Sequence, residues 1–172
     1  WELCIVDDSS SRTEVLTYLK DLPKRDSRIK VNFRSQNGGI AISSNEAIAS
    51  ASGEFLAFLD HDDLLAPEAL IEVVLHLAAH PKTDFLYSDD DKIDSKGRRR
   101  SPQFKPDWSP ELLLSHCYVS HLKVVRSTLS QEIGHLREGF DGSQDYDYAL
   151  RLTEQARHVG HIPKILYHWR VS

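Results

Sequence analysis

The pattern of apolar and polar residues predicts three strands in the first third of the chain. Residues 3–6 and 55–59 form continuous apolar runs, whereas residues 29–33 alternate between apolar and polar side chains. A continuous run of this length is typical of a strand covered on both faces of a parallel sheet, although a buried helix has the same pattern. Alternation is typical of a half-buried strand. We therefore expect three strands here, with helices between them.

Local start and stop signals predict the helices. Ser11 and Glu14 match the S-x-x-E pattern of a capping box, and Pro23 is expected to end the helix that follows. A small-residue helix is expected over about 40–51, and Pro67 is expected to open a third helix in its first turn. This order of strands and helices predicts a mostly parallel central sheet with right-handed crossovers.

The second half of the chain departs from this alternation. Residues 92–106 are polar and rich in basic side chains, which favours a solvated hairpin or a mobile loop. No internal repeat and no sign of a second domain is present, so residues 1–172 are predicted to form one α/β domain. The other expected elements are strands at 84–87, near 123–125 and at 165–170, and helices at 109–114, before Gly134 and at 146–156.

Carboxylates cluster directly after several of the predicted strands. Such groups repel one another unless a cation or water relieves them, and ligands bind at the carboxyl ends of strands in open α/β sheets. Either a divalent cation that bridges a nucleotide diphosphate or an acidic loop that caps the next helix accounts for the pattern. The clusters after predicted strands are Asp7 with Asp8, Asp60 with Asp62 and Asp63, and Asp89 to Asp91. A fourth group, Asp141 with Asp145 and Asp147, lies in the turn that opens the helix over 146–156.

Composition narrows the range of functions. The chain has 172 residues, 40% of them hydrophobic, which is enough for the core of one compact domain. Its formal net charge of -5 argues against a general nucleic-acid binder, which normally has a basic face. No apolar stretch approaches the roughly 20 residues of a membrane span, and no signal peptide is present. Neither G-x-x-x-x-G-K-[ST] nor G-x-G-x-x-G occurs, so bound phosphates would need a metal ion to neutralise them.

Six motifs resemble, in order and spacing, the family 2 glycosyltransferases of GT-A type. The resemblance covers nearly the whole chain and is greatest to bacterial enzymes that build surface polysaccharide, including rhamnosyltransferase-like members. It implies a GT-A-like, Rossmann-type α/β/α sandwich and an inverting sugar transfer. The motifs are VDDSS at 6–10, NGGIAISSNEAI at 37–48, GEFLAFLDHDDLLAPEAL at 53–70, FKPDWSPELLL at 104–114, FDGSQDYDYALRL at 140–152 and IPKILYHWR at 162–170.

One departure from the family pattern concerns the beginning of the chain. The family fold normally has an extra apolar strand and helix before the VDDSS strand, and this chain, which starts on Trp1, lacks both. We therefore expect a fragment of a longer polypeptide that is truncated at its N-terminus. A sheet without that strand would expose an apolar edge, which favours self-association.

The resemblance implies a donor site that contains a divalent cation, Mn²⁺ or Mg²⁺. Asp60, His61 and Asp62 match the D-x-D motif that binds the donor diphosphate through the metal, with Asp62 favoured as the direct ligand. His168 falls where some members supply a third metal ligand, although a strand histidine without a chemical role fits the sequence equally well. The residues expected to contact the nucleotide are Asp7, Asp8, Arg34 and Asn37.

The acceptor side of the site is expected near the start of the helix over 146–156. Gln144 and Asp145 stand in place of the family's common Glu-Asp pair, which makes Asp145 the candidate catalytic base. Independently of the resemblance, inverting transfer needs a carboxylate that takes the proton of the acceptor hydroxyl, but a first-turn aspartate is also favoured by the helix dipole. Further candidates for acceptor contacts are Asp89, Asp91, Gln144 and Trp169.

The expected function is transfer of a sugar from a nucleotide-sugar donor to a saccharide or lipid-linked saccharide acceptor. The resemblance to polysaccharide-building enzymes implies a cytoplasmic location at the inner face of the plasma membrane and no nucleic-acid partner. Two alternatives stay open, a non-catalytic carbohydrate-binding or assembly module and a nucleotidyltransferase of related fold. The first would bind saccharide in the presence of EDTA, and the second would need a glycine-rich loop with a basic residue near its first strand.

Overall fold

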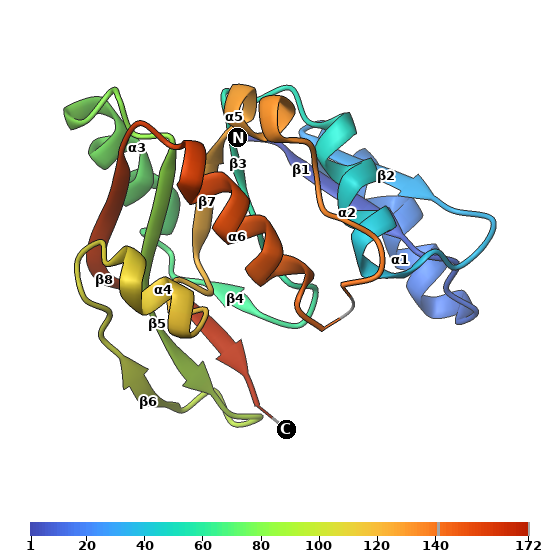
Figure 1. Cartoon of the computed structure of the whole chain (residues 1–172). Helices are drawn as coiled ribbons and strands as arrows, with labels where there is room; N and C mark the ends of the chain where they lie inside the picture. The colour runs from blue at the N-terminus through green and yellow to red at the C-terminus, as the bar shows by residue number, and fades with distance from the viewer. Residues whose placement is uncertain (141, 172) are drawn as a thin grey trace. The chain divides into compact units, whose positions relative to one another are not determined.

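A computed structural model describes residues 1–140 and 142–171, and the acidic residue Asp141 lies outside the described residues. The chain forms two compact units, and Figure 1 shows its course. Unit 1 contains residues 1–54 and 134–148, and unit 2 contains residues 55–133 and 149–171.

Unit 1 is built on a pair of parallel strands. β1 (Leu3–Asp7) and β2 (Ile29–Phe33) pair along their whole lengths, with Leu3 opposite Ile29 and Asp7 opposite Phe33. α1 (Thr13–Arg25) contacts β2, and α2 (Gly39–Ser50) contacts β1. The predicted strand–helix–strand–helix order of this segment is confirmed.

α1 begins and ends differently from the prediction. No side-chain hydrogen bond caps its first turn, so the expected capping box of Ser11 and Glu14 does not form. Pro23 lies inside the last turn and does not end the helix. A proline removes a single backbone hydrogen bond, and at this position the pair of Arg25 Nε with Asp21 Oδ2, 2.6 Å apart, stabilises the same turn. A basic side chain at a helix C-terminus is favoured in addition by the helix dipole.

Unit 2 contains a six-stranded mixed sheet. Its strand order is β3-β7-β5-β8-β4, and β6 pairs with β5. β5 and β8 run parallel, whereas the other pairs are antiparallel. The strands are β3 (Phe55–Ala57), β4 (Leu64–Leu65), β5 (Phe85–Ile93), β6 (Arg99–Gln103), β7 (Lys123–Arg126) and β8 (Val159–Arg170), and the helices are α3 (Ala69–Ala79), α4 (Pro110–Ser115), α5 (Ser127–Ile133) and the part of α6 (Gln144–Gln155) that follows residue 148.

The mixed sheet corrects the expectation of mostly parallel strands. Parallel pairing holds for β1 with β2 and for β5 with β8, and it fails for the four remaining pairs. The expectation extended the strand–helix alternation of the first half to the whole sheet, but a short connection such as that between β5 and β6 favours an antiparallel partner. β3 is also shorter than the predicted strand over 55–59, although Phe58 N still donates to Lys123 O at 3.1 Å.

α3 packs one face on the sheet and exposes another. Ala69 and Val73 belong to the buried core of unit 2. Gly160 of β8 leaves room for the His76 side chain of α3, because a Cβ there would lie 2.5 Å from His76 Nε2. Pro67 lies in the turn before α3 and not, as predicted, in its first turn.

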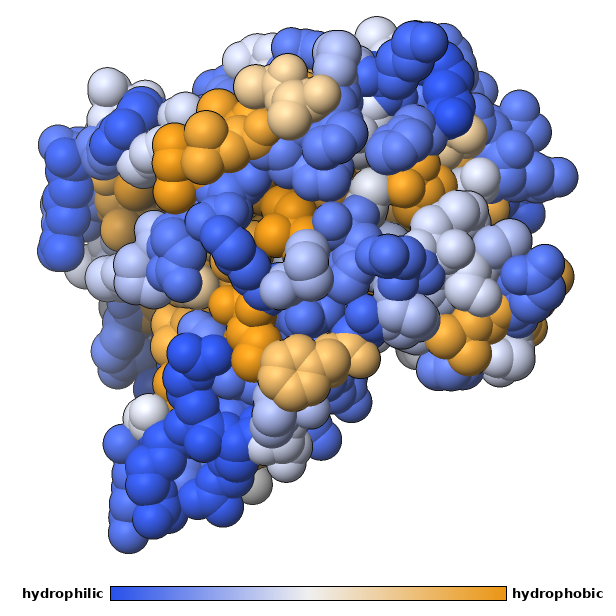
Figure 2. Space-filling model, turned by 90° about the vertical axis from the view of Figure 1, so that its left-hand side faces the viewer, coloured by the Kyte–Doolittle hydropathy of each residue, from blue (hydrophilic) through white to orange (hydrophobic). Residues whose placement is uncertain are grey.

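None of the helices formed by the described residues is long and apolar enough to cross a membrane. The exposed apolar side chains of α3 are Leu70, Ile71, Val74 and Leu75. Figure 2 shows that apolar residues reach the surface at several places on one face of the molecule.

Candidate functional site

The predicted site residues are distributed over both units. Unit 1 contains the candidate nucleotide contacts, and unit 2 contains the D-x-D residues. Joint action of the two groups on one donor and one acceptor stays a prediction. The candidates in unit 1 are Asp7, Asp8, Arg34, Asn37, Gln144 and Asp145, and those in unit 2 are Asp60, His61, Asp62, Asp89, Asp91, His168 and Trp169.

In unit 1, the loop that precedes α2 folds around Asp8. The two carboxylate oxygens of Asp8 accept hydrogen bonds from the backbone N–H groups of Gly38 and Gly39, both at 2.8 Å. Arg34 Nε lies 3.0 Å from Asp8 Oδ1, and Asn37 Nδ2 donates to the Asp8 carbonyl at 3.2 Å. Three predicted nucleotide contacts therefore lie together.

Hydrogen bonds and charge keep the Asp8 carboxylate ionised. The N–H of Gly38 is the main cause that lowers the pKa of Asp8, and Gly39 and Arg34 add to it. Arg34 also forms an ion pair with Glu46 of α2, so its guanidinium is bound by two carboxylates. Gly38 leaves room for the Arg34 guanidinium, because a Cβ there would lie 2.7 Å from Arg34 Nη2 and the arginine side chain would have to move. The result is a preformed loop whose polar groups are fixed before any ligand binds.

Asp7, the remaining nucleotide candidate, has a structural contact of its own. Its side chain is buried at the end of β1, and its Oδ2 accepts a hydrogen bond from Ser10 N at 3.1 Å. Between the two residues, Ser9 has a φ of 66°, a left-handed conformation that the turn requires. Asp7 therefore stabilises the turn after β1, and its contact with a nucleotide base stays a prediction.

In unit 2, Asp60 to Asp63 form the acidic segment, which connects β3 to β4. The side chains of Asp60 and Asp62 are 48% and 58% exposed, and that of His61 is 97% exposed. The carboxylate of Asp63 is bound on both oxygens, by the Tyr167 hydroxyl at 2.7 Å and by the Arg170 N–H at 2.7 Å. One carboxylate of the segment thus has a structural role, and the two that match the D-x-D motif reach solvent.

The backbone of the acidic segment is tied to β8 as well. The N–H of Asp60 donates to the Tyr167 hydroxyl at 3.2 Å, and Arg170 Nε donates to the carbonyl of Asp62 at 2.6 Å. The ring of His121 stacks on Tyr167 with centroids 4.6 Å apart, and its Nε2 lies 3.4 Å from Asp60 Oδ2. These contacts fix the main chain of the segment independently of its exposed carboxylates.

The exposed pair fits a hard divalent cation. Among residues 1–140 and 142–171, no group of three or more His, Cys, Asp or Glu side chains could hold a metal ion. Mg²⁺ and similar ions do not need such a cage, since they bind through one or two carboxylates, substrate phosphates and water. Asp60 and Asp62 could supply those carboxylates.

His168 is paired with an acid of the neighbouring strand. Its side chain is buried, and its Nδ1 lies 2.6 Å from Asp91 Oδ1. Arg99 Nε approaches the other oxygen of Asp91 at 2.6 Å. His168 is not gathered with Asp60 and Asp62 into a metal-binding cluster of described residues. Its role as a third ligand stays a prediction.

The acids at 89–91 lie inside β5 and do not follow its end, which corrects the prediction of a strand over 84–87. All three are at most 3% exposed. Asp89 Oδ1 lies 2.9 Å from His161 Nε2, and Asp90 Oδ2 lies 2.8 Å from Lys105 Nζ. A buried carboxylate is tolerated when a cation or hydrogen bonds compensate it. Acceptor contacts of Asp89 and Asp91 stay predictions.

Lys105 is the central partner in this interior network. Its ammonium donates to the carbonyls of Ser88 at 2.6 Å, Val119 at 3.1 Å and His121 at 2.5 Å, besides its pair with Asp90. Burial raises the pKa of Asp90 and lowers that of Lys105, so each depends on the other to stay charged. The basic stretch 92–106, predicted as solvated, therefore contains one buried cation.

Asp145 lies in the first turn of α6, at the helix start as predicted, and its side chain is half-buried. Gly142, with a φ of 83°, allows the turn that leads into the helix. Asp147, two residues further in the same turn, has its Oδ1 3.5 Å from Arg137 Nη1. Gln144 Oε1 is buried without a hydrogen-bond partner among the described residues.

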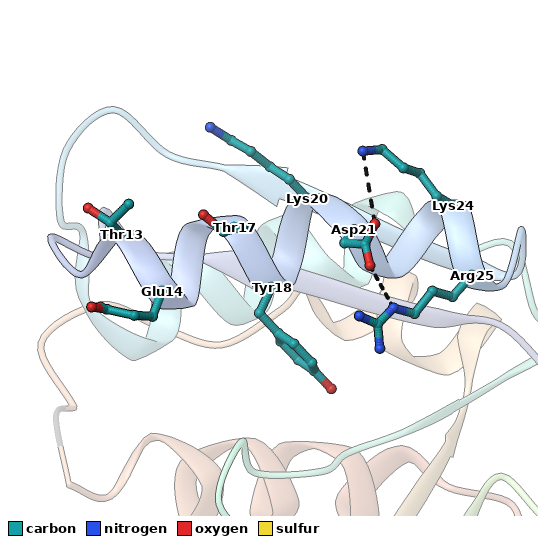
Figure 3. A pocket seen from close by; sticks show the side chains of 8 residues that line it. All are labelled: Thr13, Glu14, Thr17, Tyr18, Lys20, Asp21, Lys24 and Arg25. Atoms are coloured by element: carbon teal, nitrogen blue, oxygen red, sulfur yellow. Dashed lines mark hydrogen bonds and ion pairs between the residues drawn. The ribbon is translucent and has the colours of Figure 1, made fainter.

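A hollow of about 690 Å³ lies along α1 and contains none of the predicted site residues. All eight residues that line it belong to this one helix (Figure 3). Asp21 is paired there with Arg25 at 2.6 Å and with Lys24 at 3.9 Å. Ligand sites combine apolar walls with a few convergent polar groups from several elements. We therefore do not assign a substrate to this hollow.

Comparison with protein families decides the family. The model described as "Glycosyl transferase family 2" matches residues 1–134. The chain belongs to this family. The resemblance found in the six sequence motifs is confirmed.

Two curated relatives match this family 2 chain over almost its whole length. The uncharacterized protein y4gI of Sinorhizobium fredii is 47% identical over 100% of the chain and 19% of its own length. The O-antigen biosynthesis protein RfbC of Myxococcus xanthus is 45% identical over 99% of the chain and 13% of its own length. The family 2 chain thus spans less than a fifth of either relative.

Solved structures confirm the fold class. S. aureus TarS 1-349 superposes with a TM-score of 0.77 at 25% identity, over 98% of this chain and 51% of that one. A second TarS 1-349 structure, in complex with UDP-GlcNAc, has a TM-score of 0.79 at 23% identity over 99% of this chain and 50% of that one. The family 2 chain therefore has the predicted GT-A fold.

Sequence reasoning missed the β8 residues that hold the acidic segment of the family 2 chain. Tyr167 and Arg170 lie in a run that predicts a strand but gives no sign of what the strand binds. β4, which follows the acidic segment and pairs with β8 at Tyr167 and His168, is two residues long, too short for a period-2 pattern. The motif IPKILYHWR marked this strand as shared with the family, without assigning a role to either side chain.

Proposed function

We propose that this chain binds a nucleotide-sugar donor and transfers its sugar, with inversion, to a saccharide or lipid-linked saccharide acceptor. The observation that carries the proposal is the acidic segment, which is anchored through Asp63 and exposes the carboxylates of Asp60 and Asp62. Membership of glycosyl transferase family 2 supports the reaction type. The complex of TarS with UDP-GlcNAc supports a nucleotide sugar as the donor class.

A divalent cation, Mn²⁺ or Mg²⁺, would be held by Asp62 and Asp60 together with the donor diphosphate. When bound, it would stabilise the negative charge that develops on the leaving diphosphate. His168 would join through Nε2, because its Nδ1 faces Asp91 at 2.6 Å. Metal-binding histidines usually donate their other ring N–H to a carboxylate or carbonyl. The Asp91–His168 pair therefore supports this assignment.

The nucleotide part of the donor would contact the loop around Asp8. Arg34 supplies a guanidinium and Asn37 an exposed amide on the same loop. Because the N–H groups of Gly38 and Gly39 already hold the Asp8 carboxylate, ligand binding would not require this loop to be ordered first.

Asp145 would act as the general base. The acceptor oxygen would form its bond to C1 of the donor sugar while the bond from C1 to the diphosphate oxygen breaks. The proton of the acceptor hydroxyl would pass to the Asp145 carboxylate, and the electron pair of the broken bond would leave on the nucleotide diphosphate. The position of Asp145 in the first turn of α6, half-buried, supports a carboxylate held in one orientation.

The acceptor is proposed from the relatives' names. RfbC is described as an O-antigen biosynthesis protein, which supports a growing polysaccharide as the acceptor class. Such a substrate, if lipid-linked, would place the reaction at the cytoplasmic face of the membrane. Asp89, Asp91, Gln144 and Trp169 stay candidates for contacts on that side.

Thermal unfolding with a panel of nucleotide sugars tests the proposal. The protein is melted with UDP-, dTDP- and GDP-linked sugars, each with Mn²⁺ and with EDTA. One of these donors should raise the melting temperature in Mn²⁺ and not in EDTA, since a ligand that binds the folded state stabilises it. Stabilisation by free saccharides in EDTA, with no response to any nucleotide sugar, would favour a non-catalytic carbohydrate-binding module.

A further inference from the structure

The hydroxyl of Tyr167 joins the two ends of the acidic segment. Tyr167 is fully buried on β8, and its oxygen accepts a hydrogen bond from Asp60 N at 3.2 Å and donates one to Asp63 Oδ2 at 2.7 Å. A phenol is protonated at neutral pH, so the Tyr167 hydroxyl can donate to Asp63 while it accepts from Asp60 N. Both hydrogen-bonding capacities of this hydroxyl are thus used on one turn.

Arg170, three residues after Tyr167 on β8, binds the same turn. Its N–H donates to Asp63 Oδ1 at 2.7 Å, and its Nε donates to the carbonyl of Asp62 at 2.6 Å. β4, which follows the segment directly, is itself paired with β8. The turn is therefore bound to β8 at its beginning, in its middle and at its end.

We propose that Tyr167 and Arg170 are positioning residues that fix the acidic segment in one turn, with Asp60 and Asp62 exposed and Asp63 withheld from any cation. The anchoring follows from the contacts of β8, while its consequence for the donor rests on the proposed function. Ligand groups that are ordered during folding bind more tightly, because their ordering entropy does not oppose binding. The turn therefore leaves the carboxylates of Asp60 and Asp62 available to a cation and keeps that of Asp63 bound to β8.

A variant that lacks only the Tyr167 hydroxyl distinguishes its hydrogen bonds to the acidic segment from the packing of its ring. Tyr167→Phe keeps the ring that stacks on His121 and loses both hydrogen bonds to the acidic segment. Tyr87→Phe is the matched control, because Tyr87 is 1% exposed and its hydroxyl donates to Pro106 O at 2.7 Å, a bond outside the segment. Each variant loses one buried phenol oxygen, but only Tyr167→Phe should alter the turn of the acidic segment.

Amide hydrogen exchange of the metal-free protein measures the anchoring. In Tyr167→Phe, exchange of the amides at 60–63 should be at least about fivefold faster than in wild type, the effect of one lost net hydrogen bond. In Tyr87→Phe it should be unchanged. Arg170→Gln, at an exposed position, should also accelerate exchange and provides a second test if Tyr167→Phe does not fold. Unchanged exchange at 60–63 in the folded Tyr167 or Arg170 variant overturns the proposal.

Calorimetric titration with Mn²⁺ and a stabilising nucleotide sugar measures the consequence. Tyr167→Phe should weaken Mn²⁺-dependent donor affinity several-fold relative to Tyr87→Phe, and the donor KM should rise more than kcat falls. Equal donor affinity in the two variants, despite faster exchange at 60–63, overturns the link to the donor. If wild type shows no Mn²⁺-dependent affinity, the proposed function fails, whereas the exchange result still decides the anchoring.

Discussion

Asp91 Oδ1 lies 2.6 Å from His168 Nδ1, and the two residues face each other across the parallel pair β5–β8. With an ionised carboxylate, His168 Nδ1 is the donor, which leaves the lone pair of a neutral ring on Nε2. Arg99 Nε holds the second oxygen of Asp91 at 2.6 Å. The contacts of Asp91 with His168 and Arg99 therefore fix the orientation of this histidine ring.

Asp91→Asn should weaken Mn²⁺ binding in the presence of donor by about 10-fold or more, the usual effect of losing the outer partner of a metal-bound histidine. The measurement is a Mn²⁺ titration followed by electron paramagnetic resonance. Asp94→Asn is the control, because Asp94 lies near the tip of the same hairpin and pairs with Arg98 at 3.0 Å. Equal Mn²⁺ affinity in both variants would remove His168 from the metal site.

Asp145→Asn should reduce the rate of sugar transfer by about 10²–10⁴-fold, the usual contribution of a general base, and leave donor affinity within a factor of two. The neighbouring Asp147→Asn serves as the control, since Asp147 lies in the same helical turn and faces Arg137 at 3.5 Å. Single-turnover transfer and calorimetric donor binding give the two quantities. Wild-type turnover in Asp145→Asn would exclude this residue from the mechanism.

Asp84 should contribute to stability in a pH-dependent way. Its carboxylate is 4% exposed and accepts hydrogen bonds from Arg157 and Arg126, which lower its pKa from 3.8 to about 2. Because the folded pKa is the lower one, this contribution is complete above about pH 4 and is lost as the pH falls toward about 2. The shift corresponds to roughly 2 kcal/mol.

Urea unfolding of Asp84→Asn tests this contribution. The free energy of unfolding should fall by roughly 2 kcal/mol at pH 7, and the difference from wild type should shrink below about pH 4. Asp26→Asn is the comparison, because Asp26 has a pKa that is also lowered to about 2, by Arg28, but belongs to a surface pair. Its effect should be smaller and sensitive to salt. A difference for Asp84→Asn that persists at low pH would contradict this assignment.

Lys105→Met should lower the free energy of unfolding by about 3–5 kcal/mol, because it leaves the buried Asp90 without its cation. Lys92→Met, which removes an exposed lysine of β5, should have little effect. The double variant Lys105→Met/Asp90→Leu should recover part of the loss, since no uncompensated charge remains. A Lys105→Met protein with wild-type stability in urea would show that this network does not support the fold.

Local patterns sufficed to predict the βαβα order of residues 3–50, and the order of the motifs sufficed to predict the family. The continuous apolar run at 3–6 predicted β1 and the alternation over 29–33 predicted β2, and the acids at 60–63 were correctly expected in a connection after a strand. Strand direction in unit 2 could not be predicted in this way. Antiparallel pairing of β3 with β7 joins residues about 70 positions apart, and nothing local to residues 55–57 encodes that partner.

The sequence predicted which types of residue make up the candidate site, but not which of them are exposed and which have structural contacts. Asp63 and Asp62 are neighbours of the same type, yet Asp63 binds Tyr167 and Arg170 while the side chain of Asp62 is 58% exposed. That difference depends on β8, about a hundred residues later in the chain. The same holds for Asp89 to Asp91, because His161 and His168 lie on β8, and Arg99 and Lys105 lie on or just after β6, outside the local pattern of residues 84–91.

Donor binding by wild type and Asp62→Ala, measured by calorimetry with and without Mn²⁺, tests the central claim most directly. The claim is that the exposed carboxylates of the acidic segment hold a cation and, through it, a nucleotide diphosphate. Wild type should bind a stabilising nucleotide sugar at least about 10-fold more tightly in Mn²⁺ than in EDTA, and Asp62→Ala should lose that difference. Equal affinity of wild type in Mn²⁺ and in EDTA would contradict it.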